Sequence, residues 1–165
     1  MRVAYDGPAL DVAADPDGPR AFQDDARAYR WSGVDVLAYK AEGSAPFKDV
    51  TRQVLFDEPE MGCQWRYFEV AAGGHTTLER HEHVHAVMIL RGSGTALVGT
   101  QVAAFGPYDL FRVPPLTWHQ FCASEDEPMG FLCLVRSERD RPQLPSADDL
   151  AELRAQPEVA QAIRL

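Results

Sequence analysis

The sequence has no long hydrophobic run and few cysteines. No part of the 165-residue chain approaches the roughly 18 consecutive apolar residues that cross a bilayer, and its first residues lack the apolar core of a signal peptide. The three cysteines, Cys63, Cys122 and Cys133, lie far apart without CxxC spacing, so the sequence indicates neither a disulfide framework nor a cysteine zinc site. The sequence therefore predicts a soluble, cytoplasmic protein with reduced thiols.

Basic residues are also scarce. The chain has 16 lysines and arginines against 25 acidic residues, a formal net charge of −9, and its cationic residues form no run. Nucleic-acid binding depends on a concentrated basic face, so this charge argues against a polyanion partner. We expect a small molecule as the ligand, and neither nucleic acid nor a membrane as a partner.

The overall composition is that of one compact domain, with 45% apolar, 25% charged and 10% aromatic residues. A chain of this length buries about 68–70% of the surface that it exposes when unfolded. Folding therefore does not depend on disulfides or a structural metal. Any metal that binds is expected to be functional.

Most of the chain shows the pattern of short strands. Runs rich in β-branched and aromatic residues, with partial alternation, are separated by Gly, Pro and Asp turns. Closely spaced strands without intervening helices are typical of an all-β barrel or sandwich, and we favour a small barrel. The expected strands are 34–40, 50–56, 63–70, 86–90, 95–98, 101–105, 110–113, 120–123 and 130–135.

The two ends of the chain depart from this pattern. Residues 1–32 are rich in Asp, Pro and Gly and are expected to form an arm with one short strand. In the tail, Ser146 is the predicted N-cap of a helix over 147–154, and Pro157 is placed to begin a second helix over 158–163. We expect one domain in three parts: an arm with outer strands at 1–60, a barrel core at 61–137 and a helical tail at 138–165.

The histidines are concentrated in the middle of the chain. Four ligand-type residues there share one parity: Glu79, His81, His83 and His85. An extended backbone would point all four to one face, where burial without a partner is costly, and a metal ion resolves that conflict. Imidazoles with one carboxylate suit Mn, Fe, Ni, Cu or Zn. Because alternate residues of a strand lie roughly 7 Å apart, a bend near residues 82–84 is expected.

The spacing of these residues resembles the first metal-binding motif of the cupin superfamily. When Gly92 is taken as the closing glycine of that motif, His85 occupies its Glu/His position and His81 its second histidine. Glu79 then stands in place of the first histidine. An alternative register pairs His81 with His83 and leaves Glu79 outside the ligand set, but its spacing fits the motif less well. In the favoured register His83 lies at the pocket rim or behind the ligands.

The second cupin motif is matched by residues 106–119, which run from a glycine through two prolines to His119. The resemblance covers about residues 68–135 and implies a single jelly-roll-type β-barrel with one divalent transition metal. The ligands that it implies are Glu79, His81, His85 and His119. In similar cupins the Phe-x-Cys pair of the last strand, here Phe131 and Cys133, faces the metal chamber.

Polar residues on the preceding strands are candidates to anchor a substrate. We single out Arg52, Gln53, Arg66 and Tyr67, each with an ordinary surface or cross-strand pair as the alternative. His75 is expected in the approach turn, as a loop residue. Cupins commonly dimerise, so a homodimer is also expected.

The expected function is that of a metal-dependent enzyme on a small organic molecule. Dioxygenase (oxidoreductase) chemistry is the first prediction, with isomerase or lyase chemistry close behind, and Glu79 could also act catalytically by carrying a proton. The alternative is a non-catalytic cupin that senses or sequesters a small molecule or metal. Metal-free sugar epimerase chemistry is disfavoured, because four ligand-type residues stand at motif spacing.

Overall fold

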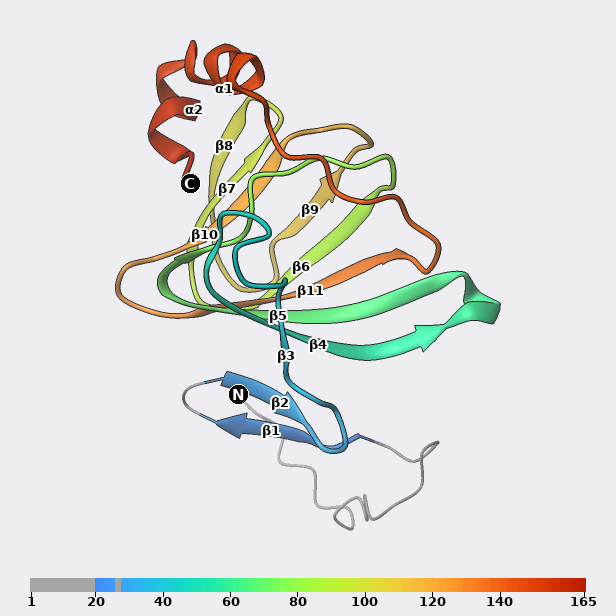
Figure 1. The fold of residues 1–165 in the computed structure, drawn as a ribbon. Coiled ribbons are helices and arrows are strands. Elements are labelled where there is room, and N and C mark those ends of the chain that lie inside the picture. Colours follow the sequence, from blue (N-terminus) through green and yellow to red (C-terminus); the bar gives the residue numbers. More distant parts are fainter. Residues whose placement is uncertain (1–19, 26–27) are drawn as a thin grey trace.

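The computed structural model describes residues 20–25 and 28–165, and its main feature is a curled antiparallel sheet (Figure 1). Along the sheet the strands follow the order β8-β7-β10-β5-β11-β6-β9, with β4 pairing to β5 and β3 to β4. The strands of this sheet are β3 (Leu37–Ala38), β4 (Lys48–Glu58), β5 (Cys63–His75), β6 (His85–Arg91), β7 (Gly94–Val98), β8 (Gln101–Phe105), β9 (Leu110–Val113), β10 (His119–Ala123) and β11 (Met129–Arg136).

The sequence pattern predicts this all-β fold correctly, with differences at three places. The run 34–40 is paired only over Leu37–Ala38, and β5 continues through the two glycines to His75. Gly73 adopts a left-handed φ of 66° and donates its N–H to Ser124 O at 2.8 Å, so the backbone stays attached to the sheet across this irregular point. His75 is consequently a strand residue.

The third difference is in the arm, which holds two strands where one was expected. β1 (Phe22–Asp25) and β2 (Ala28–Trp31) form a separate two-stranded sheet, drawn below the curled sheet in Figure 1. Its Tyr29 ring stacks on Tyr67 at 6.2 Å between centroids, and Tyr29 O accepts a 2.8 Å hydrogen bond from Gln53. The arm therefore covers the outer face of β4 and β5.

Aromatic rings fill the interior of the curled sheet. Phe68 stacks on Phe131 with centroids 5.0 Å apart, and Phe131 stacks on Phe121 at 5.2 Å. These rings come from β5, β11 and β10, and they pack in one cluster with buried aliphatic residues such as Val87 and Ile89. They also form one wall of the cavity described below.

A short 3-10 turn and two helices complete the fold: η1 (Pro59–Met61), α1 (Ala147–Arg154) and α2 (Pro157–Ala162). As predicted, Ser146 caps α1, and its side chain and that of Asp149 form a reciprocal capping box. Gln120 holds the end of the tail, because its side chain donates to Arg164 O at 2.8 Å and accepts from Arg164 N at 2.9 Å. None of the described helices is long and apolar enough to cross a membrane.

Candidate metal-binding site

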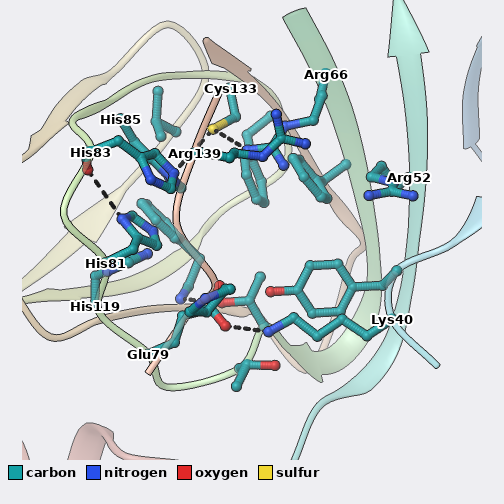
Figure 2. A pocket seen from close by; sticks show the side chains of 18 of the residues that line it. Lys40, Arg52, Arg66, Glu79, His81, His83, His85, His119, Cys133 and Arg139 are labelled. Carbon is teal, nitrogen blue, oxygen red and sulfur yellow. Dashed lines mark hydrogen bonds and ion pairs between the residues drawn. The ribbon is translucent and has the colours of Figure 1, made fainter. Parts of the chain in front are cut away.

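A cavity of about 240 Å³ opens inside the curled sheet, and its walls differ in chemistry (Figure 2). One wall carries ligand-type side chains and another carries guanidinium groups. Rings of the aromatic cluster also line the cavity. The ligand-type residues are Glu79, His81, His83, His85 and His119, and all five are buried. A cavity of this volume suits a small organic molecule as the ligand.

The backbone around Glu79 explains why these side chains converge. Glu79 and His119 form an isolated antiparallel bridge, with N–H···O distances of 3.2 and 3.0 Å, so their side chains point to the same side. The chain then bends at Glu82 and His83 before β6 begins at His85. The predicted bend therefore turns the side chains of His83 and His85 into the cavity that Glu79 and His119 also line.

The five groups form two overlapping sets of three. Ligand atoms of His81, His83 and His85 lie within 4.8 Å of one another, and those of Glu79, His81 and His119 do the same. His81 belongs to both sets, and its ring centroid lies 4.0 Å from each of the other two rings of its own segment. His83, expected at the rim or behind the ligands, is a member of one of these two sets.

Hydrogen bonds at Nδ1 orient three of the imidazoles. His81 Nδ1 donates to His83 O at 3.1 Å and His119 Nδ1 donates to Thr117 O at 3.0 Å. His83 Nδ1 donates to the Asp140 carboxylate at 2.7 Å. These bonds fix the tautomer in which Nε2 carries a free lone pair, as a metal ligand requires.

Among the Nε2 atoms of the site, that of His81 is buried and lacks a partner in the described residues, whereas those of His83 and His85 lie within hydrogen-bond distance of each other, at 3.0 Å. A buried imidazole nitrogen without a partner is costly, and a bound cation would satisfy it. The residues present therefore fit a transition metal.

Burial holds the imidazoles of His81, His85 and His119 in the neutral form that binds metal. Burial, with the neighbouring rings of His119 and His83, lowers the pKa of His81 to about 4. Burial also lowers the pKa of His119 to about 4 and depresses that of His85 still further. At neutral pH no proton has to leave these rings before a metal binds.

Two partners of the cluster were not found by sequence reasoning. Lys40 Nζ forms an ion pair with the Glu79 carboxylate, and Asp140 accepts the hydrogen bond that orients His83. Lys40 follows β3 and Asp140 follows β11, both far from the histidine segment in the chain. Neither stands in a motif, so no local signal could have located them.

The predicted pocket residues divide into two groups. Arg66, Phe131 and Cys133 line the cavity, with Arg52 beside them. Gln53 and Tyr67 are not among its lining residues, since strand alternation turns them to the outer face of β4 and β5 under the arm. His75 also lies outside the cavity, with Nδ1 bonded to Thr76 O at 3.1 Å.

Comparison with known proteins agrees with this architecture. The cupin domain family matches residues 66–135, which include both histidine motifs. A crystal structure of a cupin 2 conserved barrel domain protein from Rhodopseudomonas palustris has 53% sequence identity and a TM-score of 0.83, covering 90% of this chain and 100% of that one. The chain belongs to the cupin superfamily.

A solved structure and a curated protein, both from Rhodospirillum rubrum, are also similar to this cupin. The crystal structure of a cupin-2 domain protein has 60% identity and a TM-score of 0.77, over 81% of this chain and 89% of that one. A curated relative, named 1-methylthio-D-xylulose 5-phosphate methylsulfurylase, is 57% identical over 147 residues. The match covers 89% of this cupin and 94% of that relative.

Proposed function

We propose that this cupin is a metal-dependent enzyme that acts on 1-methylthio-D-xylulose 5-phosphate, the compound in the name of the Rhodospirillum rubrum relative. One observation carries the proposal: a cluster of metal-ligand side chains and a group of arginines line the same small cavity. A phosphorylated keto sugar offers oxygens for a metal at one end and a dianion for cations at the other. Both kinds of wall therefore have a counterpart in this substrate.

In this proposal His81, His85 and His119 hold the metal, with Glu79 and His83 contributing from the two sides of His81. When bound, the metal supplies a Lewis acid that polarises the substrate's carbonyl. The Nδ1 bonds of His81, His83 and His119 keep the imidazoles in place before the ligand arrives. No reorganisation of these rings is needed for binding.

Glu79 is the group best placed to move a proton. Its carboxylate is buried at the cavity wall and forms an ion pair with Lys40. A carboxylate in this position can take or return a proton at the substrate carbon next to the carbonyl. Lys40 then has the role of orienting Glu79.

The aromatic wall suits the methylthio group. Phe68, Phe121 and Phe131 line the cavity with their rings, and thioether sulfur makes favourable contacts with aromatic side chains. This apolar wall keeps water away from the sulfur-bearing carbon. The substrate's polar and apolar ends thus have distinct places to bind.

The dioxygenase, isomerase and lyase activities expected from the sequence stay predictions, as does the non-catalytic alternative. Methylsulfurylase chemistry is favoured over them because the named relative shares 57% identity over nearly its whole length. Dioxygenase chemistry would make turnover depend on dissolved oxygen. Methylsulfurylase chemistry would not.

The test is an assay of the metal-loaded protein on 1-methylthio-D-xylulose 5-phosphate under air and under argon, with and without a small thiol that can accept the methylsulfur group. In the presence of the thiol we expect the C1–S bond to break, the methylthio group to form a mixed disulfide with the thiol sulfur and C1 to take up a proton, seen by proton NMR at equal rates under both gases. Glu79→Gln should lower kcat by roughly 100-fold, the usual worth of a proton-transfer group. An unchanged substrate in all four conditions would refute the assignment.

The cytoplasmic location and the homodimer also stay predictions. An apolar groove on the outer face, lined by Trp65, Met88 and Leu110 among others, supports an interface between copies. Light scattering of the purified protein tests this. A monomer at micromolar concentration would contradict it.

A further inference from the structure

Three arginines gather on the cavity wall beside the histidine cluster. Arg52 comes from β4, Arg66 from β5 and Arg139 from the segment after β11 (Figure 2). In the sheet register Arg52 pairs with Phe68, two residues from Arg66 on the same face, and Arg66 pairs with Cys133. Neighbouring strands therefore bring the positive charges of Arg52 and Arg66 together.

These charges have no counter-ion of their own. Among residues 20–25 and 28–165, no ion pair joins Arg52, Arg66 or Arg139 to a carboxylate. The Nε atoms of Arg52 and Arg66 are buried without a hydrogen-bond partner in the same residues, and Arg66 is only 9% exposed. Buried charge without a partner is expensive, so this wall is built for a ligand that brings negative charge.

The contacts that do exist hold the guanidiniums in place. Arg139 donates to Ser137 O at 3.2 Å and to Gln64 Oε1 at 3.0 Å, and Arg66 Nη2 lies 3.6 Å from Cys133 Sγ. Burial and the charge of Arg66 together lower the pKa of Arg52. Burial and the charges of Arg66 and Arg52 lower the pKa of Arg139 in the same way. The Asp57 carboxylate partly offsets this at Arg139.

We propose that Arg52, Arg66 and Arg139 form a phosphate subsite that binds the terminal phosphate of the sugar substrate and fixes which end of it reaches the histidine cluster. This inference rests on the proposed function for the identity of the substrate. Guanidinium groups match the geometry of a phosphate with paired N–H donors, and several of them neutralise its two charges. Lys40 is not part of the subsite, because it is already paired with Glu79.

The place of the subsite agrees with the length of a five-carbon sugar. Cys133 Sγ lies 3.5 Å from His85 Nδ1 and 3.6 Å from Arg66 Nη2, so one side chain separates the histidine cluster from the arginines. With phosphate on the arginines, the carbonyl end of the same molecule reaches the imidazoles. Reversal of the substrate would leave the buried guanidinium groups of Arg52 and Arg66 without an anionic partner.

The binding test uses inorganic phosphate as the probe and calorimetric titration of the metal-loaded protein. We expect Arg66→Gln and Arg52→Gln each to weaken phosphate binding by roughly 10- to 100-fold, the usual worth of a hydrogen bond to a charged group. Arg112→Gln, on the exposed side of β9, is the charge-matched control and should bind as the wild type does. If the buried Arg66→Gln does not fold, the less buried Arg52→Gln carries the test.

A second comparison separates the arginines from the metal. Phosphate should still bind to His81→Gln if it sits on the arginines. Binding that is lost in His81→Gln and unchanged in Arg52→Gln would overturn the subsite, and so would a wild type that binds no phosphate. Acetate should bind much more weakly than phosphate, because it brings one charge and two oxygens.

Turnover distinguishes this inference from the proposed function. If the wild type turns over 1-methylthio-D-xylulose 5-phosphate but handles the unphosphorylated sugar with equal kcat/KM, the subsite is wrong and the function stands. If neither sugar is turned over but the arginine variants lose phosphate, the function is wrong and the subsite stands. We expect a loss of roughly 100-fold or more in kcat/KM for the unphosphorylated sugar.

Discussion

The cavity has a histidine wall, made of Glu79 and four histidines, and an arginine wall, made of Arg52, Arg66 and Arg139. The polar groups of the two walls differ in whether they have hydrogen-bond partners. On the histidine wall, Nδ1 of His81, His83 and His119 each has a partner, and burial holds the rings of His81 and His119 in the neutral form. On the arginine wall, positive charges lie side by side with buried N–H groups left open. The first wall is preorganised for a cation and the second for an anion, so one cavity can orient a molecule that carries both an electron-rich carbonyl and a phosphate.

The largest expected effect comes from removing the residue shared by both ligand sets. His81→Gln should lower metal affinity by more than the roughly 100-fold that loss of an orienting partner can cause, because it removes a ligand itself. His75→Gln is the matched control, since His75 is also buried but lies outside the cavity. Metal content by elemental analysis after dialysis measures the difference, and full occupancy in His81→Gln would show that the cluster is not the metal site.

A smaller effect is expected at the partner of His83. Asp140→Asn keeps the size of the side chain but removes the charge that accepts the 2.7 Å hydrogen bond. We expect metal affinity to fall by roughly 10- to 100-fold, as for other carboxylates that orient metal-bound imidazoles. The change is followed by competition with a chelator, with Asp149→Asn on α1 as the control. Equal affinities in the two variants would mean that His83 is not held for a metal.

The sequence predicts the two walls unequally, for a physical reason. His81, His83 and His85 stand at fixed spacing on one segment, where strand parity and one bend bring them together, and the resemblance to the second cupin motif adds His119 on β10. Lys40, Arg139 and Asp140 depend on how distant segments pack, and no local pattern encodes that. Strand alternation places Arg66 and Tyr67 on opposite faces, but the sequence alone does not show which parity faces the cavity, and both residues were predicted as substrate anchors.

The neutral histidines should also make the metal-free protein sensitive to acid. The pKa values of His81 and His119 are about 4 in the folded chain, below the usual value of about 6.5 when unfolded. The unfolded chain therefore binds more protons between these values, and the free energy of unfolding falls as the pH drops from about 6.5 toward 4. Thermal melts of chelator-treated protein measure this slope. His119→Gln should reduce the slope, and a slope equal to that of the wild type would contradict this account.

The arginine wall should respond unevenly, with its smallest effect at Arg139. Arg139 is exposed, whereas Arg66 is buried, and charges near solvent are screened. We expect Arg139→Gln to raise KM for the phosphorylated sugar by roughly 2- to 5-fold and to leave kcat unchanged. Raising the ionic strength should raise the KM of the wild type slightly and that of Arg139→Gln less, because the variant already lacks the contact that salt screens. An effect at Arg139 as large as that at Arg66 would mean that the phosphate lies at the mouth of the cavity, near solvent, and not against the buried guanidinium.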